Sequence, residues 1–305
     1  MLRSTNVVMP SFLVIGAAKA GTTAVNQFFA EHPEVYICPV QEPRFFSFEG
    51  QKFSPDHPLH AKTVTTIEEY RALFDGVTDE KAVGEVSPSY LHNTRAPGNI
   101  QAHLPDVRLI AVLRNPVDRA YSHFLHYVKG GTETTTDFAS ALNDVEGLSL
   151  DDWKPRRDYV RFGFYHEQLS RYFARFDPKQ IKVYLFEDLR REPEETLKDV
   201  YRFVGVDDTF LPDYSKQHNV SGIPRSRALR SFLDRPNAAK SFLRRCIPGP
   251  VRRRTADIVR LRNLRKPELS KTVRAELVEV FRDDVLQLQE LIGRDLSKWL
   301  ELPAS

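Results

Sequence analysis

The chain has 305 residues, with 44 Lys and Arg against 41 Asp and Glu, and a formal net charge of +3. Hydrophobic residues make up 41% of it and aromatic residues 11%, which is enough for a substantial core and excludes an intrinsically disordered chain. No apolar run approaches the roughly 18–20 residues of a membrane span, and the two cysteines, Cys38 and Cys246, form no metal-type pair. We therefore expect a cytoplasmic globular protein with no transmembrane segment and no disulfide framework.

The small net charge hides a strong asymmetry along the chain. Residues 222–274 contain sixteen basic and three acidic side chains, so this stretch carries +13 and the rest of the chain carries −10. Such a concentration of positive charge points to an anionic partner. Pro236, Pro248 and Pro250 interrupt the stretch, which favours short helices and loops inside a single domain of residues 1–305.

Four short apolar runs predict buried strands, and stretches with helical periodicity separate them. The strands are expected at 12–15, 82–86, 108–113 and 181–186, and the helices between them at 22–31, 116–128 and 165–176. This alternation predicts an α/β fold with a central, mostly parallel sheet flanked by helices. Apolar residues recur at helical spacing from Val273 to Trp299, which predicts a C-terminal helix over 271–300 docked on the core.

A loop of small residues joins the first predicted strand to the first helix, and its sequence is Gly16-Ala-Ala-Lys19-Ala20-Gly21-Thr22-Thr23. Gly and Ala let backbone N–H groups approach an anion closely, the helix N-terminus adds a partial positive charge, and Lys19 adds a full one. The two threonines can cap the helix or donate to phosphate oxygens. We interpret the loop as a phosphate site; the alternative is an ordinary tight turn.

The loop departs from that of the nucleotide triphosphatases, because Lys19 lies inside it and does not follow the second glycine. The strand at 108–113 ends in Arg114, where a Mg²⁺ site would need a carboxylate. Arg114 and Ser122 can share a second phosphate; the alternative is that Arg114 pairs with Asp118 while Ser122 faces solvent. The two elements together predict a site for a nucleotide with two anionic ends and no metal.

In this order, the two elements resemble those of the sulfotransferase family that uses 3′-phosphoadenosine 5′-phosphosulfate (PAPS) as its donor. Segments 39–46, 84–90 and 186–189 also fit, and the resemblance extends from about Phe12 to Trp299. The chain is most similar to a bacterial branch related to heparan sulfate and other carbohydrate sulfotransferases. The resemblance implies an enzyme that moves a sulfuryl group from PAPS to a hydroxyl or amine of a small-molecule or glycan acceptor. The product of the donor is then 3′-phosphoadenosine 5′-phosphate (PAP).

The resemblance also implies a role for each residue that matches the family. The first loop, with Lys19, Ala20, Gly21, Thr22 and Thr23, binds the 5′-phosphosulfate, and Lys19 stabilises the leaving phosphate. Arg114 and Ser122 bind the 3′-phosphate. A further loop closes over the nucleotide, and the matching residues there are Ser221, Gly222, Arg225 and Arg227. A solvated basic loop is the alternative for that last segment.

Glu42 is the candidate general base, since an acceptor must lose its proton as it attacks. It precedes the aromatic pair 45–46, which can form the apolar floor of a pocket. The alternative for Glu42 is an ion pair with Arg44 or Lys52. Histidine can also act as a base, and the candidates are His57, His60, His126 and, most interesting because it follows the 84–90 segment, His92.

Several features of the sequence leave the acceptor open. Some carbohydrate enzymes of the family carry a second Lys where this chain has Val86, and the clusters at 244–245 and 252–254 have no assigned role. Two other classes of function stay possible: a nucleotide-dependent kinase with a variant P-loop, and a module that binds nucleic acid or a membrane through residues 222–274. The Pro breaks and the lack of a groove-reading motif count against nucleic acid. The sequence does not reveal the oligomeric state.

Overall fold

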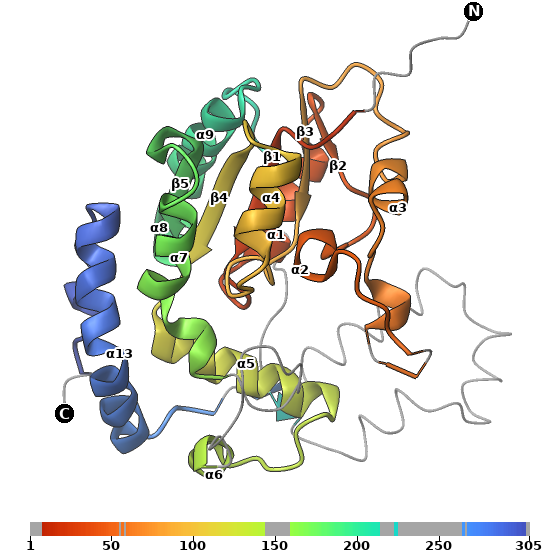
Figure 1. Ribbon diagram of the computed structural model, residues 1–305. Coiled ribbons are helices and arrows are strands. Elements are labelled where there is room, and N and C mark those ends of the chain that lie inside the picture. Colours follow the sequence, from red (N-terminus) through yellow and green to blue (C-terminus); the bar gives the residue numbers. More distant parts are fainter. Residues whose placement is uncertain are drawn as a thin grey trace, which may run out of the picture.

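The computed structural model describes residues 8–54, 56–57, 59–143, 159–213, 223–224, 264–265 and 267–302. Its centre is a five-stranded parallel sheet with the strand order β2-β3-β1-β4-β5 (Figure 1). The strands are β1 (Phe12–Gly16), β2 (Val35–Ile37), β3 (Ala82–Val86), β4 (Arg108–Leu113) and β5 (Ile181–Leu185). This confirms the predicted α/β fold and all four predicted strands. Within this sheet, the short edge strand β2 was not predicted.

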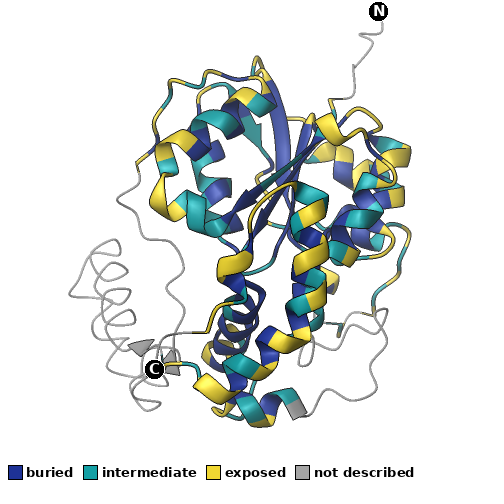
Figure 2. Cartoon of the chain, turned by 90° about the vertical axis from the view of Figure 1, so that its left-hand side faces the viewer, coloured by how far each residue is buried: buried dark blue, intermediate teal, exposed yellow. Residues whose placement is uncertain are grey.

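The central strand β1 is buried along its whole length, because strands flank it on both sides and helices cover both faces. Its Phe12 lies opposite Gly84 of β3. A Cβ atom at Gly84 would come within 2.2 Å of the Phe12 ring, so the ring needs a glycine at this position. Figure 2 shows these strands as the most deeply buried part of the molecule, between helices that expose their outer faces. Such continuous burial is expected for a parallel sheet.

Helices cover the two faces of the sheet in two groups. On one face lie α1 (Thr22–Glu31) and α9 (Pro193–Val204), joined by a hydrogen bond of 3.2 Å from the Tyr201 hydroxyl to the Phe28 carbonyl. On the other face lie α4 (Ala96–His103), in front of the strands in Figure 1, and α7 (Tyr165–Phe173). Right-handed crossover connections put the two groups on opposite faces. The chain crosses the sheet toward β2 after β1 and in the opposite direction, toward β4, after β3.

Helix α5 (Pro116–Gly130) crosses beneath the carboxyl ends of the strands (Figure 1). Its first turn is fixed by the Asn115 side chain, which accepts hydrogen bonds from the backbone N–H groups of Val117 and Asp118. Pro116 occupies the first helical position, where its missing N–H costs nothing. The helix therefore starts where the sequence predicted and extends two residues further.

The C-terminal segment differs from the prediction of one helix over 271–300. Helix α13 (Lys271–Ile292) ends at Gly293, whose φ of 62° is left-handed, and a separate 3₁₀ turn (Ser297–Trp299) follows. Glycine is the residue that most readily adopts this conformation after a helix. The segment packs on the core through Phe281, whose ring centre lies 5.1 Å from that of Phe164. The helical periodicity therefore identified the buried face correctly but not the break.

The remaining elements are short. They are the helices α2 (Phe45–Phe48), α3 (Ile67–Ala72), α6 (Phe138–Asn143) and α8 (Phe186–Arg191), and the 3₁₀ turns His60–Lys62, Arg161–Gly163 and Pro178–Gln180. Two short strands, β6 (Ile223–Pro224) and β7 (Leu264–Arg265), pair antiparallel. Much of the basic stretch 222–274 lies outside the described residues, so the single domain of 1–305 stays a prediction. Within the described part of the chain, no helix is long and apolar enough to cross a membrane.

Candidate active site

The predicted site residues gather at the carboxyl edge of the sheet. The loop 17–21 follows β1, and Arg114 follows the neighbouring strand β4. The chain continues from β1 toward one edge of the sheet and from β4 toward the other, so the two strands flank the point where the strand order reverses. Ligands of open α/β sheets bind at this point. The topology therefore brings together two elements that lie almost a hundred residues apart.

The loop after β1 leaves the start of α1 open to an anion. Lys19 and Gly21 both have left-handed backbones, with φ of 72° and 92°. Gly21 is the N-cap of α1, no side chain caps the helix, and the first turn holds no acidic residue. The first N–H groups of a helix have no partner within it, and together with the helix dipole they favour an anion. The predicted contact residues Ala20 and Thr22 are buried in this loop, and Thr23 is half-buried.

Lys19 lies in a crowded and positively charged setting. The pKa of its ammonium is lowered to about 8, first by burial and then by the charges of Lys129 and Arg114, while Glu42 opposes them. An ammonium held among other cations is an unfavourable arrangement until an anion arrives. Lys19 is therefore placed to gain from the binding of a phosphate-like group.

Arg114 is built into the same site. Its guanidinium donates to the Lys19 carbonyl at 3.2 Å and lies 4.8 Å from the centre of the Phe186 ring. The buried Tyr165 hydroxyl donates to the Arg114 carbonyl at 3.0 Å, which fixes the end of β4. Burial lowers the pKa of Arg114, although a guanidinium stays charged at any physiological pH. Arg114 thus touches the first loop directly and presents a charge beside it.

The alternative interpretation of Arg114 and Ser122 fits the structure only in part: the charge of Asp118 does act on Arg114. Asp118 pairs with Arg274 of α13 at 2.5 Å. Ser122 does not face solvent either, since it is only 3% exposed on α5. A role for both residues in binding a second phosphate stays a prediction that this geometry allows.

Glu42 lies in the segment that follows β2. In the sheet, β2 and β4 are on opposite sides of β1, the strand that leads into Lys19. Both Glu42 and Arg44 have left-handed backbones, with φ of 54° and 59°, and their side chains form an ion pair. The ion pair that we gave as the alternative for Glu42 is therefore present. Phe45 and Phe46 are fully buried below the segment, as predicted for an apolar floor. The Glu42 charge acts on Lys19 and on His126 of α5, so the carboxylate shares one electrostatic neighbourhood with them.

The face of α5 that carries His126 and Lys129 is a part of the site that we did not predict as such. Both residues are exposed, and they lie three positions apart on one face of the helix. Their crowded setting lowers the pKa of His126 to about 4, with burial of the ring as the largest cause and Lys19 and Lys129 next. Lys129 supplies positive charge near Lys19, whereas Val86 is buried at the end of β3. An i, i+3 pair of basic residues was the only sequence signal.

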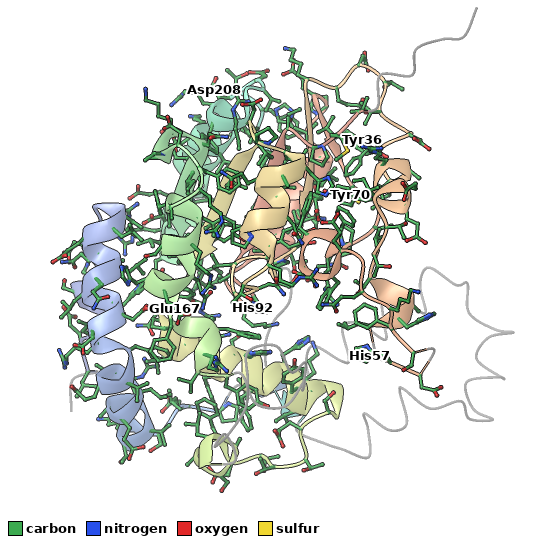
Figure 3. All side chains as sticks on the ribbon, in the orientation of Figure 1. Tyr36, His57, Tyr70, His92, Glu167 and Asp208 are labelled. Atoms are coloured by element: carbon green, nitrogen blue, oxygen red, sulfur yellow. The ribbon has the colours of Figure 1, made fainter. Side chains whose placement is uncertain are left out.

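The other histidines are poorly suited to act as a base. His92 stacks on Phe162 with ring centres 3.8 Å apart, and burial lowers its pKa to about 3. His57 stacks on Phe53, and Figure 3 shows it well apart from His92. A base with so low a pKa takes up a proton only weakly. Glu42, whose charge acts on Lys19 and whose side chain is 32% exposed, is the better-placed candidate among the described residues.

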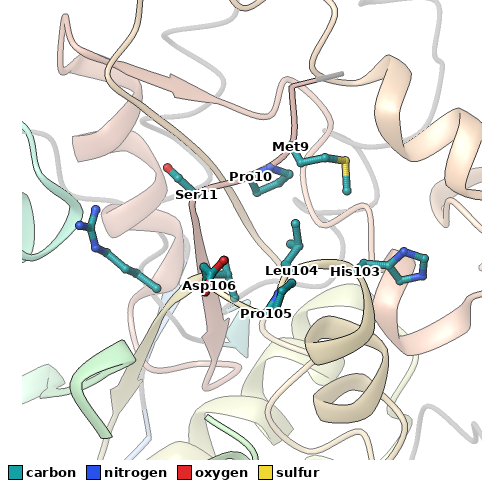
Figure 4. Close-up of a pocket in the computed structure, with 9 residues that line it drawn as sticks. Met9, Pro10, Ser11, His103, Leu104, Pro105 and Asp106 are labelled. Carbon is teal, nitrogen blue, oxygen red and sulfur yellow. The ribbon is translucent and has the colours of Figure 1, made fainter. Parts of the chain in front are cut away.

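A surface pocket elsewhere on the molecule does not belong to this site. It has a volume of about 470 Å³ and lies at the amino ends of β1 and β4, the opposite edge of the sheet (Figure 4). Its lining includes Met9, Ser11, His103 and Arg108. The chemistry predicted from the sequence is gathered at the carboxyl edge instead.

The predicted closing loop falls outside the described residues. Ser221, Gly222, Arg225 and Arg227 belong there, as do the basic clusters at 244–245 and 252–254. Within the described part of the chain, no three His, Cys, Asp or Glu side chains gather in a way that could hold a metal ion. The closing loop and the metal-free site both stay predictions.

Comparison with known proteins points to one family. A sequence profile of the sulfotransferase family matches residues 10–210. The mouse bifunctional heparan sulfate N-deacetylase/N-sulfotransferase 4 is 26% identical over 96% of this chain, which spans only 31% of that protein. The human heparan sulfate glucosamine 3-O-sulfotransferase 3B1 is 25% identical over 94% of this chain and 64% of its own length.

A solved structure extends the likeness to three dimensions. The crystal structure of a sulfotransferase from Alicyclobacillus acidocaldarius is 30% identical and superposes with a TM-score of 0.74, covering 96% of this chain and all of that one. The family profile covers well over half of the chain, and the structural match reaches almost all of it. The chain therefore belongs to the sulfotransferase family.

Proposed function

We propose that this protein transfers a sulfuryl group from PAPS to a hydroxyl or amine of an acceptor, and that the acceptor is a glycan. The observation that carries the proposal is the pairing of the uncapped α1 N-terminus and Lys19 with Arg114 across the switch point of the sheet. A donor with two anionic ends needs two such positive elements. Membership of the family supports PAPS as that donor.

The residues of the first loop take the 5′ end of the donor. Backbone N–H groups from Gly21 to Thr23 point along the axis of α1, and Lys19 adds its charge at their side. Arg114, which follows β4, and Ser122 of α5 take the 3′-phosphate. The loop with Ser221, Gly222, Arg225 and Arg227 completes this end in the proposal.

The reaction breaks the bond between sulfur and the bridging phosphate oxygen and forms a bond between sulfur and the acceptor atom. PAP carries away the electron pair of the broken bond, and the acceptor loses one proton. Lys19 stabilises the negative charge that grows on the leaving phosphate, an electrostatic contribution that is commonly about 10²- to 10³-fold in rate. Glu42 accepts the proton from the acceptor, and such transfer contributes about 10²- to 10⁴-fold.

The ion pair with Arg44 is compatible with this role for Glu42. The paired Arg44 guanidinium donates to the Glu42 carboxylate and so orients it. The side chain of Glu42 is 32% exposed, so an approaching acceptor can reach it. The pair therefore holds the base ready at the surface of the site.

The cationic surroundings support an acidic glycan as the acceptor. Lys129 projects from α5 beside Lys19, and both carry positive charge, from which an anionic polymer gains. The printed names of the similar proteins also point to heparan sulfate, with transfer to nitrogen in one and to oxygen in the other. The acceptor class is thus a glycan with acidic groups, and the accepting atom is an amine or a hydroxyl.

The test is the transfer of labelled sulfate from PAPS to N-deacetylated heparan sulfate, to intact heparan sulfate and to neutral sugars and phenols. We expect labelled glycan and an equal amount of PAP, without added Mg²⁺. A parallel arm with ATP and Mg²⁺ examines the kinase alternative. Failure to bind either PAPS or PAP, or turnover of ATP alone, overturns the proposal. Transfer to phenols alone overturns the glycan acceptor but leaves the donor in place.

A further inference from the structure

A buried carboxylate lies directly beneath the segment that carries Glu42. Glu85 is on β3 and is fully buried, with no exposed surface. Its carboxylate accepts hydrogen bonds from the hydroxyls of Tyr70 at 2.9 Å, Ser87 at 2.7 Å and Tyr90 at 2.6 Å. Figure 3 shows Tyr70 lying between α3 and the sheet. A carboxylate with three short hydroxyl donors is a fully organised group rather than a chance inclusion in the core.

Two of these hydroxyls also reach the Glu42 segment. The Ser87 hydroxyl accepts a hydrogen bond from the Arg44 backbone N–H at 3.1 Å. The Tyr90 hydroxyl accepts a longer one, at 3.5 Å, from the Phe46 backbone N–H. A hydroxyl has one proton and two lone pairs, so donating to Glu85 orients its lone pairs toward these amides. Glu85 thus fixes, through two relays, the backbone that follows Glu42.

The segment needs such support because its backbone is strained. Glu42 and Arg44 both have left-handed φ angles, of 54° and 59°, although neither is glycine. Residues in sparsely populated conformations persist only where the surrounding structure holds them, and they concentrate at functional sites. The Arg44 amide that Ser87 holds lies within one of these two residues. The relay therefore acts where the conformation of the segment is decided.

We propose that Glu85 is a positioning residue for the general base: through Ser87 and Tyr90 it holds the turn that presents Glu42 to the acceptor. The inference rests on the proposed function, in which Glu42 accepts the acceptor's proton. Glu85 itself does not touch the reactants. If Glu85 only stabilised the core, its two hydroxyl donors Ser87 and Tyr90 would not need to accept hydrogen bonds from the Arg44 and Phe46 amides.

The relay depends on the charge state of Glu85. The groups that face it are the hydroxyls of Tyr70, Ser87 and Tyr90, the thiol of Cys38 and the more distant carboxylate of Glu42. Burial raises the pKa of Glu85 to about 7. Because Oε1 already accepts from both tyrosine hydroxyls, protonation below that pH falls on Oε2, and the Ser87 hydroxyl can then no longer donate to it. The turn should then loosen as the pH falls through about 7.

The experiment compares Ser87→Ala with Ser11→Ala in the full chain. Ser11 is the control, since its hydroxyl, like that of Ser87, donates one hydrogen bond and accepts one. It donates to the Val83 carbonyl and accepts from the Val83 N–H, at the opposite edge of the sheet. Hydrogen exchange of the peptide covering 42–46 reports on the turn, and sulfuryl transfer gives kcat and the KM for PAPS. We expect Ser87→Ala to speed exchange in this peptide and lower kcat about tenfold, with the KM for PAPS within about twofold. Ser11→Ala should do neither.

Glu85→Gln supplies a second readout that a merely structural role would not move. Its side-chain amide keeps the size of Glu85 but cannot titrate. We expect a lower kcat at neutral pH. We also expect a weaker decline of kcat below about pH 7, because the contribution of Glu85 to that decline is gone. Unchanged exchange at 42–46 and an unchanged kcat in Ser87→Ala would overturn the proposal. If the unaltered protein transfers no sulfuryl group at all, the proposed function fails, but the exchange comparison still tests the relay.

Discussion

The two sides of the site are held in different ways. On the donor side, the loop 17–21 is shaped by its own backbone: Lys19 and Gly21 are left-handed, and the α1 N-terminus has no capping side chain. On the acceptor side, the segment 42–46 is held from below by hydroxyl relays that start at the buried Glu85. The donor side leaves the start of α1 without a capping side chain, whereas the acceptor segment uses the protein's own groups to place one carboxylate.

The difference follows from what each side must do. An anion with several oxygens supplies its own hydrogen-bond acceptors, so an open cradle of N–H groups and cations is enough to orient it. A general base must be placed to within a few tenths of an ångström of an acceptor that brings no fixed charge at the reacting atom. The acceptor side therefore needs a rigid support, and the donor side needs an open, positively charged anion site. Substitutions on the two sides should then separate transfer from binding.

Glu42→Gln should have the largest effect. The amide cannot accept the acceptor's proton, so we expect kcat to fall by about 10²- to 10⁴-fold. The affinity for PAP, measured by calorimetry, should stay within about twofold, because the donor side is intact. Lys52→Gln, which removes a charge ten residues along at an exposed position, is the control and should retain activity. A Glu42→Gln protein with full kcat would show that another group takes the proton.

Lys19→Ala should affect both transfer and binding, which Glu42→Gln should not. Removing the charge beside the leaving phosphate is expected to lower kcat/KM for PAPS by about 10²- to 10³-fold, and PAP should also bind more weakly. Lys179→Ala, at an exposed position of the turn before β5, is the control. Equal PAP affinity in Lys19→Ala and the unaltered protein would contradict the placement of Lys19 at the donor.

The same lysine predicts a pH dependence. Because the pKa of Lys19 is lowered to about 8, its charge is present below that pH and is lost as the pH rises through it. We therefore expect kcat/KM for PAPS to fall above about pH 8. Once the donor is bound, its negative charges raise the pKa of Lys19, so kcat should fall only at higher pH. Lys19→Arg should shift the decline of kcat/KM upward. A profile that stays flat to pH 10 would count against Lys19.

The donor side could be predicted from the sequence because its parts are local. The strand, the small-residue loop and the helix start lie within about a dozen consecutive residues, and each has its own sequence signal. Arg114 could be added because the carboxyl ends of neighbouring parallel strands share one edge of a sheet. The rule needs only the strand boundaries, and those were predicted almost to the residue.

The acceptor side could be predicted only in part. Glu42 was found through the segment around it, but its support comes from Glu85 through Ser87 and Tyr90, which reach that segment only in the folded chain. A glutamate in an apolar strand gives no sign in the sequence of which hydroxyls will surround it. The same limit applies to His92. Its side chain made it a candidate base, but the Phe162 ring that stacks on it lies seventy residues away in the sequence. Long-range packing decided both cases.

Gly21→Ala should have the smallest effect, and it tests whether the donor loop depends on its own backbone. Gly21 has a φ of 92°, and an added Cβ would lie 2.9 Å from the Phe186 ring. A left-handed alanine costs about 1–2 kcal/mol, and any shift of Phe186 also disturbs Arg114, whose guanidinium lies 4.8 Å from the centre of that ring. We expect PAP to bind about tenfold more weakly, a change of about 1.4 kcal/mol, with a lower melting temperature.

Gly98→Ala is the matched control for this change. Gly98 lies in α4, its φ is not left-handed, and no atom lies within 4 Å of an added Cβ. Alanine favours a helix over glycine by up to about 1 kcal/mol, so this variant should melt slightly higher and bind PAP normally. If both variants bind PAP equally well, the conformation of the loop 17–21 does not set donor affinity. The contrast between a donor side shaped by its backbone and an acceptor side held by Glu85 would then no longer hold.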